Sequence, residues 1–362
     1  MLLVALVGGI GGSGGAARAQ FVAGGSAPTA GAVGDFSGGF AVVSAGAKSG
    51  YMDRAGQLAI PLIFDAARPF REGFAAARFL GSKWGFIDAQ GMPVGSPEYD
   101  AVGDFREGFA AVRVGDDWGY LDHTGAVAVE PQFAAARAFG PAVSRGAASG
   151  ADVPLLAPVR VGDLWGYADT KGALVVAPQF DDAHPFVATA ADATAAVRMG
   201  EAWGYIDGRG VFVVTPQFDY ADPAPGEGIA AVRSGENWGV VDLTTGVVRL
   251  SARYEAIGTF AGGLAPVQLD GLWGWLDRMG EIAIPATFED VDGFSPDGLA
   301  LARRDGKYGY VNRSGAFVVA PQYDDAWAFA DGVARVQVGG MVGYIGPNGA
   351  FAIAPRFALP RA

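Results

Sequence analysis

The sequence predicts an all-β protein built from tandem repeats of about 35 residues. Three observations predict this. A Trp-Gly dipeptide or a close variant returns nine times at a nearly fixed spacing, the 362 residues include 57 glycines and 21 prolines, and short stretches between them alternate between apolar and polar residues. This composition is typical of short strands joined by many turns, and a fixed period identifies units that pack against copies of themselves.

The central glycine of the repeat sets the period. Successive copies are 34 to 38 residues apart, except for one interval of 47. The long interval holds an insertion at about 140–154 that we expect to be a surface loop, because it lacks apolar periodicity. The copies are Gly50, Gly85, Gly119, Gly166, Gly204, Gly239, Gly274, Gly309 and Gly343.

The third repeat illustrates the first half of the unit. Ala110 and Val112 share one face of a predicted strand, which is the pattern of a half-buried strand. After a short turn, Trp118 and Tyr120 share one face of a second strand. Gly119 lies between them and permits either the close approach of another backbone or a local bend.

The second half of the unit begins with a turn. Asp122 to Gly125 predicts a type I turn with a bulge, since Asp accepts turn amides and Gly adopts a positive φ. We expect Pro131 to close the third strand, at a strand end or edge. We expect Phe133 and Phe139, which follow, to pack between neighbouring units. The units must stack because so small a sheet cannot bury its apolar face alone.

The run Lys83-Trp84-Gly85-Phe86-Ile87-Asp88 and its copies resemble the WG-repeat family, also called KWG repeats. The resemblance covers about residues 33–358 and departs near the ends, where Ser49, Tyr308 and Val342 replace the tryptophan. It implies a bacterial β-repeat protein and supplies no catalytic residues. The motif residues expected to serve structure are Trp84, Gly85, Trp118, Gly119, Trp165, Gly166, Trp203, Gly204, Trp238, Gly239, Trp273, Gly274, Gly309 and Gly343.

Two architectures fit such an array. In a propeller the units circle an axis, whereas in an open β-solenoid they stack in a line. Residues 355–357 begin a unit that the chain end does not complete, and residues 33–36 resemble its missing part. This match favours a propeller-like ring closed by both ends, with the open solenoid as the alternative.

The N-terminal segment predicts export. Leu2–Ile10 is a short apolar run, and residues 17–19 fit a small-x-small cleavage site, although no Lys or Arg precedes the run. We therefore interpret residues 1–19 as a signal peptide, 20–32 as a flexible linker and 359–362 as a tail. The expected location is the periplasm or the exterior, with the cytoplasm as the alternative.

Composition restricts the chemistry. The absence of cysteine excludes disulfides and thiolate zinc sites, and neither His123 nor His184 has a partner at metal-ligand spacing. Asp181-Asp182 lacks the alternating oxygen ligands of a calcium loop. A net charge of -12 argues against nucleic acid as a partner. We expect no catalytic residues, no metal, no cofactor, no membrane span and no enzymatic activity.

The aromatic and basic residues allow two interpretations each. The regular tryptophans are expected to pack between units, with a row of sugar-binding platforms as the alternative. Trp275 and Trp327 break the pattern and are candidate surface contacts. Arg113 and its copies are expected to pair with acidic neighbours, or else to form an anion-binding stripe. The sequence thus predicts a non-enzymatic scaffold that binds another protein at the bacterial envelope or exterior, with a polysaccharide- or cell-wall-binding module as the alternative.

Overall fold

The computed structural model describes residues 32–358 apart from 80, 82, 143–153, 189–192, 252 and 253. The predicted signal peptide, residues 20–31 of the predicted linker and the tail at 359–362 lie outside the described residues. Residue 32 is the first residue of the first strand. Among the described residues, no helix has the length and apolar character needed to cross a membrane.

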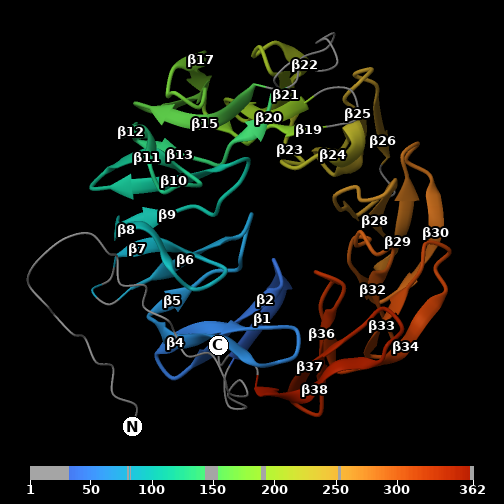
Figure 1. The fold of residues 1–362 in the computed structure, drawn as a ribbon. Helices are drawn as coiled ribbons and strands as arrows, with labels where there is room; N and C mark the ends of the chain where they lie inside the picture. The colour runs from blue at the N-terminus through green and yellow to red at the C-terminus, as the bar shows by residue number, and fades with distance from the viewer. Residues whose placement is uncertain are drawn as a thin grey trace, which may run out of the picture.

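The described residues form nine antiparallel blades arranged in a ring (Figure 1). Each blade has four main strands, which we call a to d in chain order. The d strands β30, β34 and β38 lie on the outside of the ring, and the b strands β28, β32 and β36 lie toward its centre (Figure 1). The ring confirms the propeller-like prediction and excludes the open solenoid.

The strand bounds follow the repeat. The a strands are β1 (Ala32–Ser37), β5 (Ala66–Ala67), β9 (Ala101–Val102), β13 (Ala135–Ala136), β18 (Asp182–Ala183), β23 (Tyr220–Ala221), β27 (Ala256–Ile257), β31 (Asp290–Val291) and β35 (Asp325–Ala326). The b strands are β2 (Phe40–Ala45), β6 (Phe74–Arg78), β10 (Phe109–Val114), β15 (Leu155–Val161), β20 (Ala193–Met199), β24 (Ile229–Ser234), β28 (Leu264–Leu269), β32 (Ala300–Arg304) and β36 (Ala334–Val338).

Strands c and d form the outer half of each blade. The c strands are β3 (Lys48–Met52), β7 (Trp84–Asp88), β11 (Asp117–Asp122), β16 (Leu164–Ala168), β21 (Ala202–Asp207), β25 (Asn237–Asp242), β29 (Leu272–Asp277), β33 (Lys307–Val311) and β37 (Met341–Ile345). The d strands are β4 (Leu58–Phe64), β8 (Pro93–Tyr99), β12 (Val127–Phe133), β17 (Leu174–Phe180), β22 (Phe212–Phe218), β26 (Val248–Ser251), β30 (Ile282–Phe288), β34 (Phe317–Tyr323) and β38 (Phe351–Ala358). Two extra short strands, β14 (Gly140–Pro141) and β19 (Val187–Ala188), and a 3-10 turn, η1 (Gly226–Gly228), complete the elements.

The glycine of the Trp-Gly motif allows strand d to pass closely over strand c. A Cβ on Gly119 would lie 2.3 Å from the carbonyl oxygen of Val129 and 2.7 Å from the Pro131 nitrogen. The pairing register shifts there, because Trp118 pairs with Phe133 whereas Tyr120 pairs with Val129. The predicted close approach is thereby confirmed. Equivalent close approaches occur at Gly50, Gly166, Gly204, Gly274, Gly309 and Gly343.

The proline of the repeat does not end its strand, contrary to the sequence-based prediction. Pro131 lies inside β12, which continues to Phe133. It occupies the irregular stretch between the two register points, where the strand makes no regular ladder and a missing N–H costs little. The proline therefore marks the bulge over the glycine of strand c rather than the end of strand d.

The Asp-x-x-Gly segments form the predicted turns between strands c and d. The Gly125 amide donates to the Asp122 carbonyl at 3.0 Å, and Gly125 has a φ of 80°. The Asp122 carboxylate accepts hydrogen bonds from the amides of Thr124 at 2.8 Å and Ala126 at 3.1 Å. The same carboxylate geometry occurs at Asp53, Asp88, Asp169, Asp207 and Asp277.

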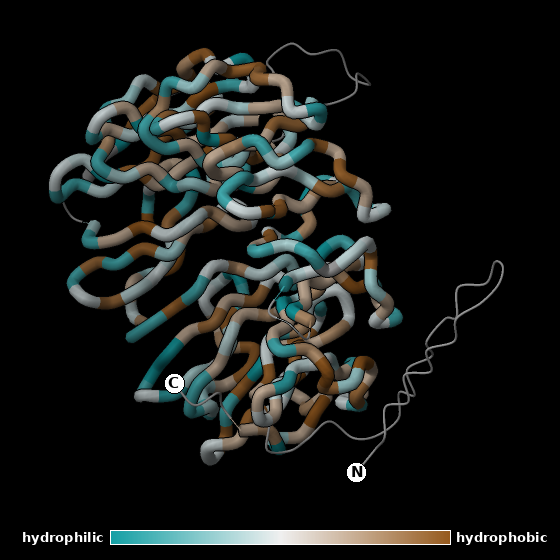
Figure 2. The backbone as a smooth tube through the Cα atoms, turned by 90° about the vertical axis from the view of Figure 1, so that its left-hand side faces the viewer, coloured by the Kyte–Doolittle hydropathy of each residue, from teal (hydrophilic) through white to brown (hydrophobic). Residues whose placement is uncertain are grey.

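Nine apolar clusters lie between the blades, and each combines residues of two neighbours. Phe133 of the third blade and Phe139 of the fourth are both buried in one of them, as the packing prediction requires. Hydrophobic and hydrophilic residues alternate along the backbone (Figure 2), and the buried hydrophobic ones lie in these cores. An open array of nine units would have eight such interfaces, so the ninth cluster closes the ring.

The closing interface brings the two ends of the array together. Val33 and Phe36 pack against Tyr344 and Phe357 in one buried cluster. Strands β1 and β38 also form a parallel bridge at Ala32 and Ala358. Because strand a belongs to the N-terminal end and strand d to the C-terminal end, the termini meet between two complete blades, and no blade is shared.

The predicted insertion loop at 140–154 is partly a paired structure. Gly140 and Pro141 form β14 and pair with Leu156 and Leu155 of β15. A Cβ on Gly140 would lie 2.0 Å from the carbonyl oxygen of Phe186 in the next blade, so this position requires glycine. Residues 143–153 lie outside the described residues.

Candidate functional site

The motif tryptophans are half-buried and pack between neighbouring blades. Trp118 pairs with Phe133 across the outer strands and lies against the core between the third and fourth blades. Trp84, Trp165 and Trp203 occupy the same position in their own interfaces. These contacts favour the packing interpretation over a row of open sugar-binding platforms.

Trp275 is not a surface contact. It is 0% exposed and stands where most repeats have the tyrosine that follows the motif glycine. Its indole Nε1 donates to the carbonyl oxygen of Asp292 in the next blade at 3.3 Å. The prediction that Trp275 is a surface contact is therefore wrong. Its indole N–H takes the place of the tyrosine hydroxyl of other repeats. Trp327 is half-buried, and the Arg335 guanidinium covers its ring at 3.9 Å.

The tyrosine that follows the motif glycine connects successive blades. The hydroxyl of Tyr120 donates to the carbonyl oxygen of Arg137 at 2.7 Å. Burial raises the pKa of Tyr167 and Tyr205 well above the usual value, so both hydroxyls are protonated donors at neutral pH. Seven of the nine interfaces have this bond, from Tyr51, Tyr120, Tyr167, Tyr205, Trp275, Tyr310 and Tyr344.

The arginines that recur in strand b lie beside the tryptophan of their own blade. The guanidinium of Arg113 lies 5.9 Å from the ring centre of Trp118, and Arg198 lies 6.0 Å from that of Trp203. Neither sequence-based interpretation of these arginines included the tryptophan as a partner. Pairing with an acidic neighbour also occurs, since Arg303 lies 3.6 Å from Glu289.

A second set of arginines, which the sequence analysis missed, connects neighbouring blades. Arg68 follows β5, stacks on Trp84 and donates to the carbonyl oxygen of Val102 in the next blade at 2.8 Å. Arg137 and Arg335 make the same kind of contact elsewhere in the ring. Arg68 and Arg137 each stand four residues after the aromatic of strand d, Phe64 and Phe133, but an arginine recurs there in too few repeats to form a pattern.

The acidic and imidazole groups serve the fold. Asp181 and Asp324 accept the amides of Gly200 and Gly339 in the turn between strands b and c. His123 lies 2.9 Å from Glu72 in the neighbouring blade. Burial, followed by the charge of Arg137, lowers the pKa of His184, which stacks on Trp203. Within the described residues, no three His, Asp or Glu side chains gather closely enough to hold a metal ion.

The most exposed apolar residues at one end of the blades lie beside the turns between strands b and c. In the third, fourth and fifth blades these are Val114, Val161, Leu164 and Met199, which are between 38% and 46% exposed. We call these four residues the apolar crescent. The three blades are consecutive, so their b–c turns follow one another along one face of the ring. Exposed carboxylates border the crescent at Asp116, Asp117, Asp163 and Glu201.

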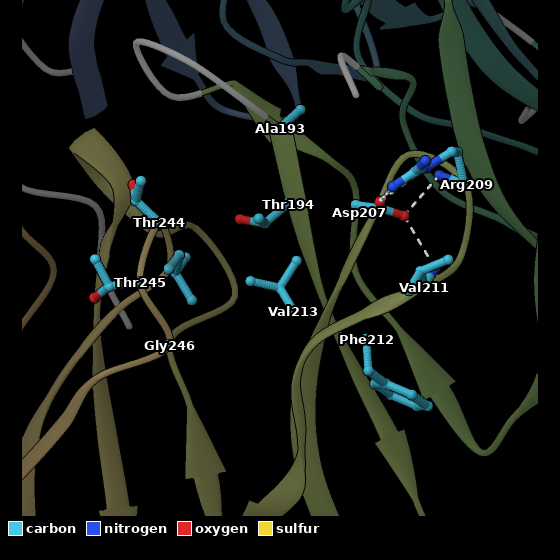
Figure 3. Close-up of a pocket in the computed structure, with 11 residues that line it drawn as sticks. Ala193, Thr194, Asp207, Arg209, Val211, Phe212, Val213, Thr244, Thr245 and Gly246 are labelled. Carbon is cyan, nitrogen blue, oxygen red and sulfur yellow. Dashed lines mark hydrogen bonds and ion pairs between the residues drawn. The ribbon is translucent and has the colours of Figure 1, made fainter. Parts of the chain in front are cut away.

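A cavity of about 240 Å³ lies between the c–d turns of the fifth and sixth blades (Figure 3). The Thr194 side chain points into it (Figure 3). Thr194 is 1% exposed, and its hydroxyl has no hydrogen-bond partner among the described residues. Asp207, which pairs with Thr194 across β20 and β21, is already engaged by its own turn and by Arg209 at 2.8 Å. A second cavity, of about 640 Å³, is lined by Arg71, Glu72, Asp104, Phe105, Arg106 and Ala138.

A third cavity, of about 350 Å³, lies between the seventh and eighth blades. Trp273 and Pro266 of the seventh blade form one side, and Val291 and Asp292 of the eighth form the other. We call it the Trp273 pocket. No guanidinium stacks on Trp273 among the residues that the structure describes, which distinguishes this tryptophan from those of the second to sixth blades.

Comparison with known proteins identifies the family. A family model described as a WG containing repeat matches residues 50–84, 84–116, 118–140, 165–200, 203–238, 238–273, 273–308 and 308–341. The chain belongs to the WG-repeat family. No curated protein matches this WG-repeat chain in sequence.

Several solved structures are similar to this WG-repeat chain. The crystal structure of a eukaryotic initiation factor matches at 10% identity and a TM-score of 0.51, with 89% of each chain covered. BamB from Moraxella catarrhalis is 16% identical with a TM-score of 0.40, covering 75% of this chain and 90% of that chain. The Dos1 propeller is 14% identical with a TM-score of 0.41, covering 81% and 93%. At these identities the likeness concerns the fold alone.

Proposed function

We propose that this WG-repeat propeller is a non-enzymatic scaffold that binds another protein through the apolar crescent. The observation that carries the proposal is the exposure of Val114, Val161, Leu164 and Met199 on consecutive blades. Apolar residues clustered on a surface mark sites of protein association, and burying them is favourable by about 25 cal/mol per Å² of apolar area.

The surroundings of the crescent indicate the chemistry of the partner. Asp116, Asp163 and Glu201 are exposed beside the four apolar residues. A partner that contributes apolar side chains at its centre and basic side chains at its rim complements this surface. The turns themselves are fixed by hydrogen bonds such as that from the Gly200 amide to Asp181 at 2.6 Å, so the surface is preorganised for contact.

We further propose that the scaffold acts at the bacterial envelope or exterior. The support is the apolar run Leu2–Ile10 followed by the small-x-small step at residues 17–19. N-terminal sequencing of the protein recovered from the periplasmic or secreted fraction tests this location. A mature N-terminus at Gln20 is the expected result, and an uncleaved chain found only in the cytoplasm contradicts it.

Affinity capture from solubilised native envelope tests the binding proposal. The double variant Leu164→Asp and Met199→Asp places two charges in the crescent. Val247→Asp and Val318→Asp form the matched control, because these valines are 45% and 48% exposed but lie next to c–d turns on the opposite face. A protein that the wild type and the control retain and the crescent variant loses supports the proposal. Equal capture by both variants contradicts the assignment of the crescent.

A further inference from the structure

An arginine guanidinium fills the same kind of slot at three interfaces of the ring. At the first of these, Arg68 lies over Trp84 of its own blade, with its Cζ 4.9 Å from the ring centre. Its Nη1 donates to the carbonyl oxygen of Val102 at 2.8 Å and lies 3.5 Å from the Asp104 carboxylate. The slot therefore has three parts, which are an indole face, a strand a carbonyl and a carboxylate of the next blade.

Two other interfaces hold a guanidinium between an indole, a strand a carbonyl and a carboxylate, although the indole at the second of them, Trp327, follows strand a instead of lying in strand c. Arg137 stacks on Trp165 at 4.5 Å, donates to the Ala183 carbonyl at 2.6 Å and pairs with Asp182 at 2.9 Å. Arg335 reaches the same carbonyl from strand b. It stacks on Trp327 at 3.9 Å, donates to the Val33 carbonyl at 2.7 Å and pairs with Asp35 at 2.9 Å. Val102, Ala183 and Val33 are each the second residue of strand a.

The interface between the seventh and eighth blades keeps the slot, and among the described residues no arginine fills it. Gly258 stands where Arg68 and Arg137 stand, and Pro266 stands where Arg335 stands. Trp273 supplies the indole, Val291 is the second residue of its strand a, and Asp292 supplies an exposed carboxylate. Together these residues line the Trp273 pocket of about 350 Å³. This volume is at the lower end of the range for ligand sites, roughly 300–1,000 Å³.

The interface between the third and fourth blades shows that the carboxylate is not a general feature. Gly103 and Ala111 occupy the two positions that could hold an arginine, and Trp118 supplies the indole. The next strand a and its continuation, residues 135–138, contain no acidic residue. That segment therefore supplies no carboxylate, and the interface serves as an internal comparison for the Trp273 pocket.

We propose that the Trp273 pocket binds the guanidinium of an arginine side chain presented by a protein partner. The chain itself shows the recognition chemistry three times, with stacking on an indole, a hydrogen bond to a strand a carbonyl and a carboxylate pair. Cation–π stacking and a charge-assisted hydrogen bond favour a planar guanidinium over an ammonium or a neutral group. The proposal deepens the scaffold function, because it names a residue type that the partner must present.

The test uses free peptides, so its outcome does not depend on finding the natural partner or on the crescent. The full chain is labelled with ¹⁵N-tryptophan, and the indole signal of Trp273 is assigned with Trp273→Phe. Acetyl-Gly-Arg-Gly-amide is titrated beside acetyl-Gly-citrulline-Gly-amide, which has nearly the same shape without the charge. We expect the Trp273 signal to move saturably with the arginine peptide alone.

Two variants locate the interaction. Asp292→Asn keeps the side-chain oxygen that accepts the Gly293 amide at 2.7 Å and removes the charge, so binding should weaken by about tenfold. Gly258→Arg with Pro266→Ala fills the slot from within, since a Cβ at 258 would lie 3.3 Å from the Pro266 ring, and it should abolish the shift. A Trp273 signal that does not respond to arginine, or responds equally to citrulline, overturns the proposal.

Discussion

The hydroxyl of Tyr344 donates a hydrogen bond to the carbonyl oxygen of Gly34, which lies 310 residues earlier in the chain. The same bond connects Tyr120 to Arg137 at an interface between consecutive blades. The closing interface is therefore built like the interfaces inside the array. A closed ring leaves no terminal blade with an uncovered apolar face, which explains why the terminal repeats need no polar cap.

Removing that hydroxyl should weaken ring closure. Tyr344→Phe deletes the donor and leaves the Gly34 carbonyl without it, so the free energy of unfolding should fall by about 1 kcal/mol. Urea denaturation followed by tryptophan fluorescence measures the change. Tyr323→Phe is the control, because the Tyr323 hydroxyl makes no hydrogen bond with the described residues. Equal effects of the two substitutions would show that the bond to Gly34 contributes nothing.

The glycine of the Trp-Gly motif should tolerate no side chain. Gly119→Ala would place a methyl group 2.3 Å from the Val129 carbonyl oxygen, and we expect a loss of about 3 kcal/mol in unfolding free energy. Gly103→Ala is the matched control, since its nearest neighbour would lie at an ordinary 3.6 Å. The shift of the urea midpoint measures both. A Gly119→Ala protein as stable as the control would refute the crossing of strands c and d.

Acid should weaken the contact between the second and third blades. Partial burial opposes ionisation of Glu72, but hydrogen bonds from Gly108, His123 and Glu107 outweigh it and hold its pKa below the usual value. A lowered carboxyl pKa stabilises the fold above the unfolded value near 4.5. This contribution disappears as pH falls through the folded value. Glu72→Gln should therefore lower the melting temperature at pH 7 and have little effect near pH 3.

The control for this pH dependence is Asp116→Asn, because the Asp116 side chain makes no hydrogen bond or ion pair with the described residues. Melting temperatures of both variants and the wild type are measured between pH 3 and pH 7. If the difference between Glu72→Gln and the wild type stays constant over this range, the hydrogen-bonded carboxylate is not its source.

Local patterns in the sequence predicted most of the blade. The alternation of Ala110 and Val112 and the turn at Asp122 depend on neighbours along the chain, so the strands and turns follow from them. The recurring glycine between two aromatics, Gly119 in the third repeat, allowed either a close backbone approach or a local bend, and the structure shows the close approach. Pro131 was misassigned because a bulge inside an outer strand has the same local residues as a strand end.

Contacts between blades were harder to predict. Trp275 was taken as a surface contact because it breaks the repeat consensus, yet it fills the tyrosine position and makes the same hydrogen bond. The Arg68 and Arg137 contacts depend on which tryptophan and which carbonyl meet in space. The Trp273 pocket arises from the absence of an arginine at Gly258, which becomes meaningful only beside the interfaces that have one.

Ring closure is the central claim, and a disulfide tests it most directly. The chain has no cysteine, so Ala32→Cys with Ala358→Cys introduces a single pair at the bridge between β1 and β38. Bridge partners in adjacent strands lie within the Cα separation that a disulfide spans. A closed ring predicts rapid oxidation to a monomer with an internal cross-link, seen as a mobility shift on a non-reducing gel. Free thiols or only intermolecular cross-links under the same conditions would contradict the closed ring.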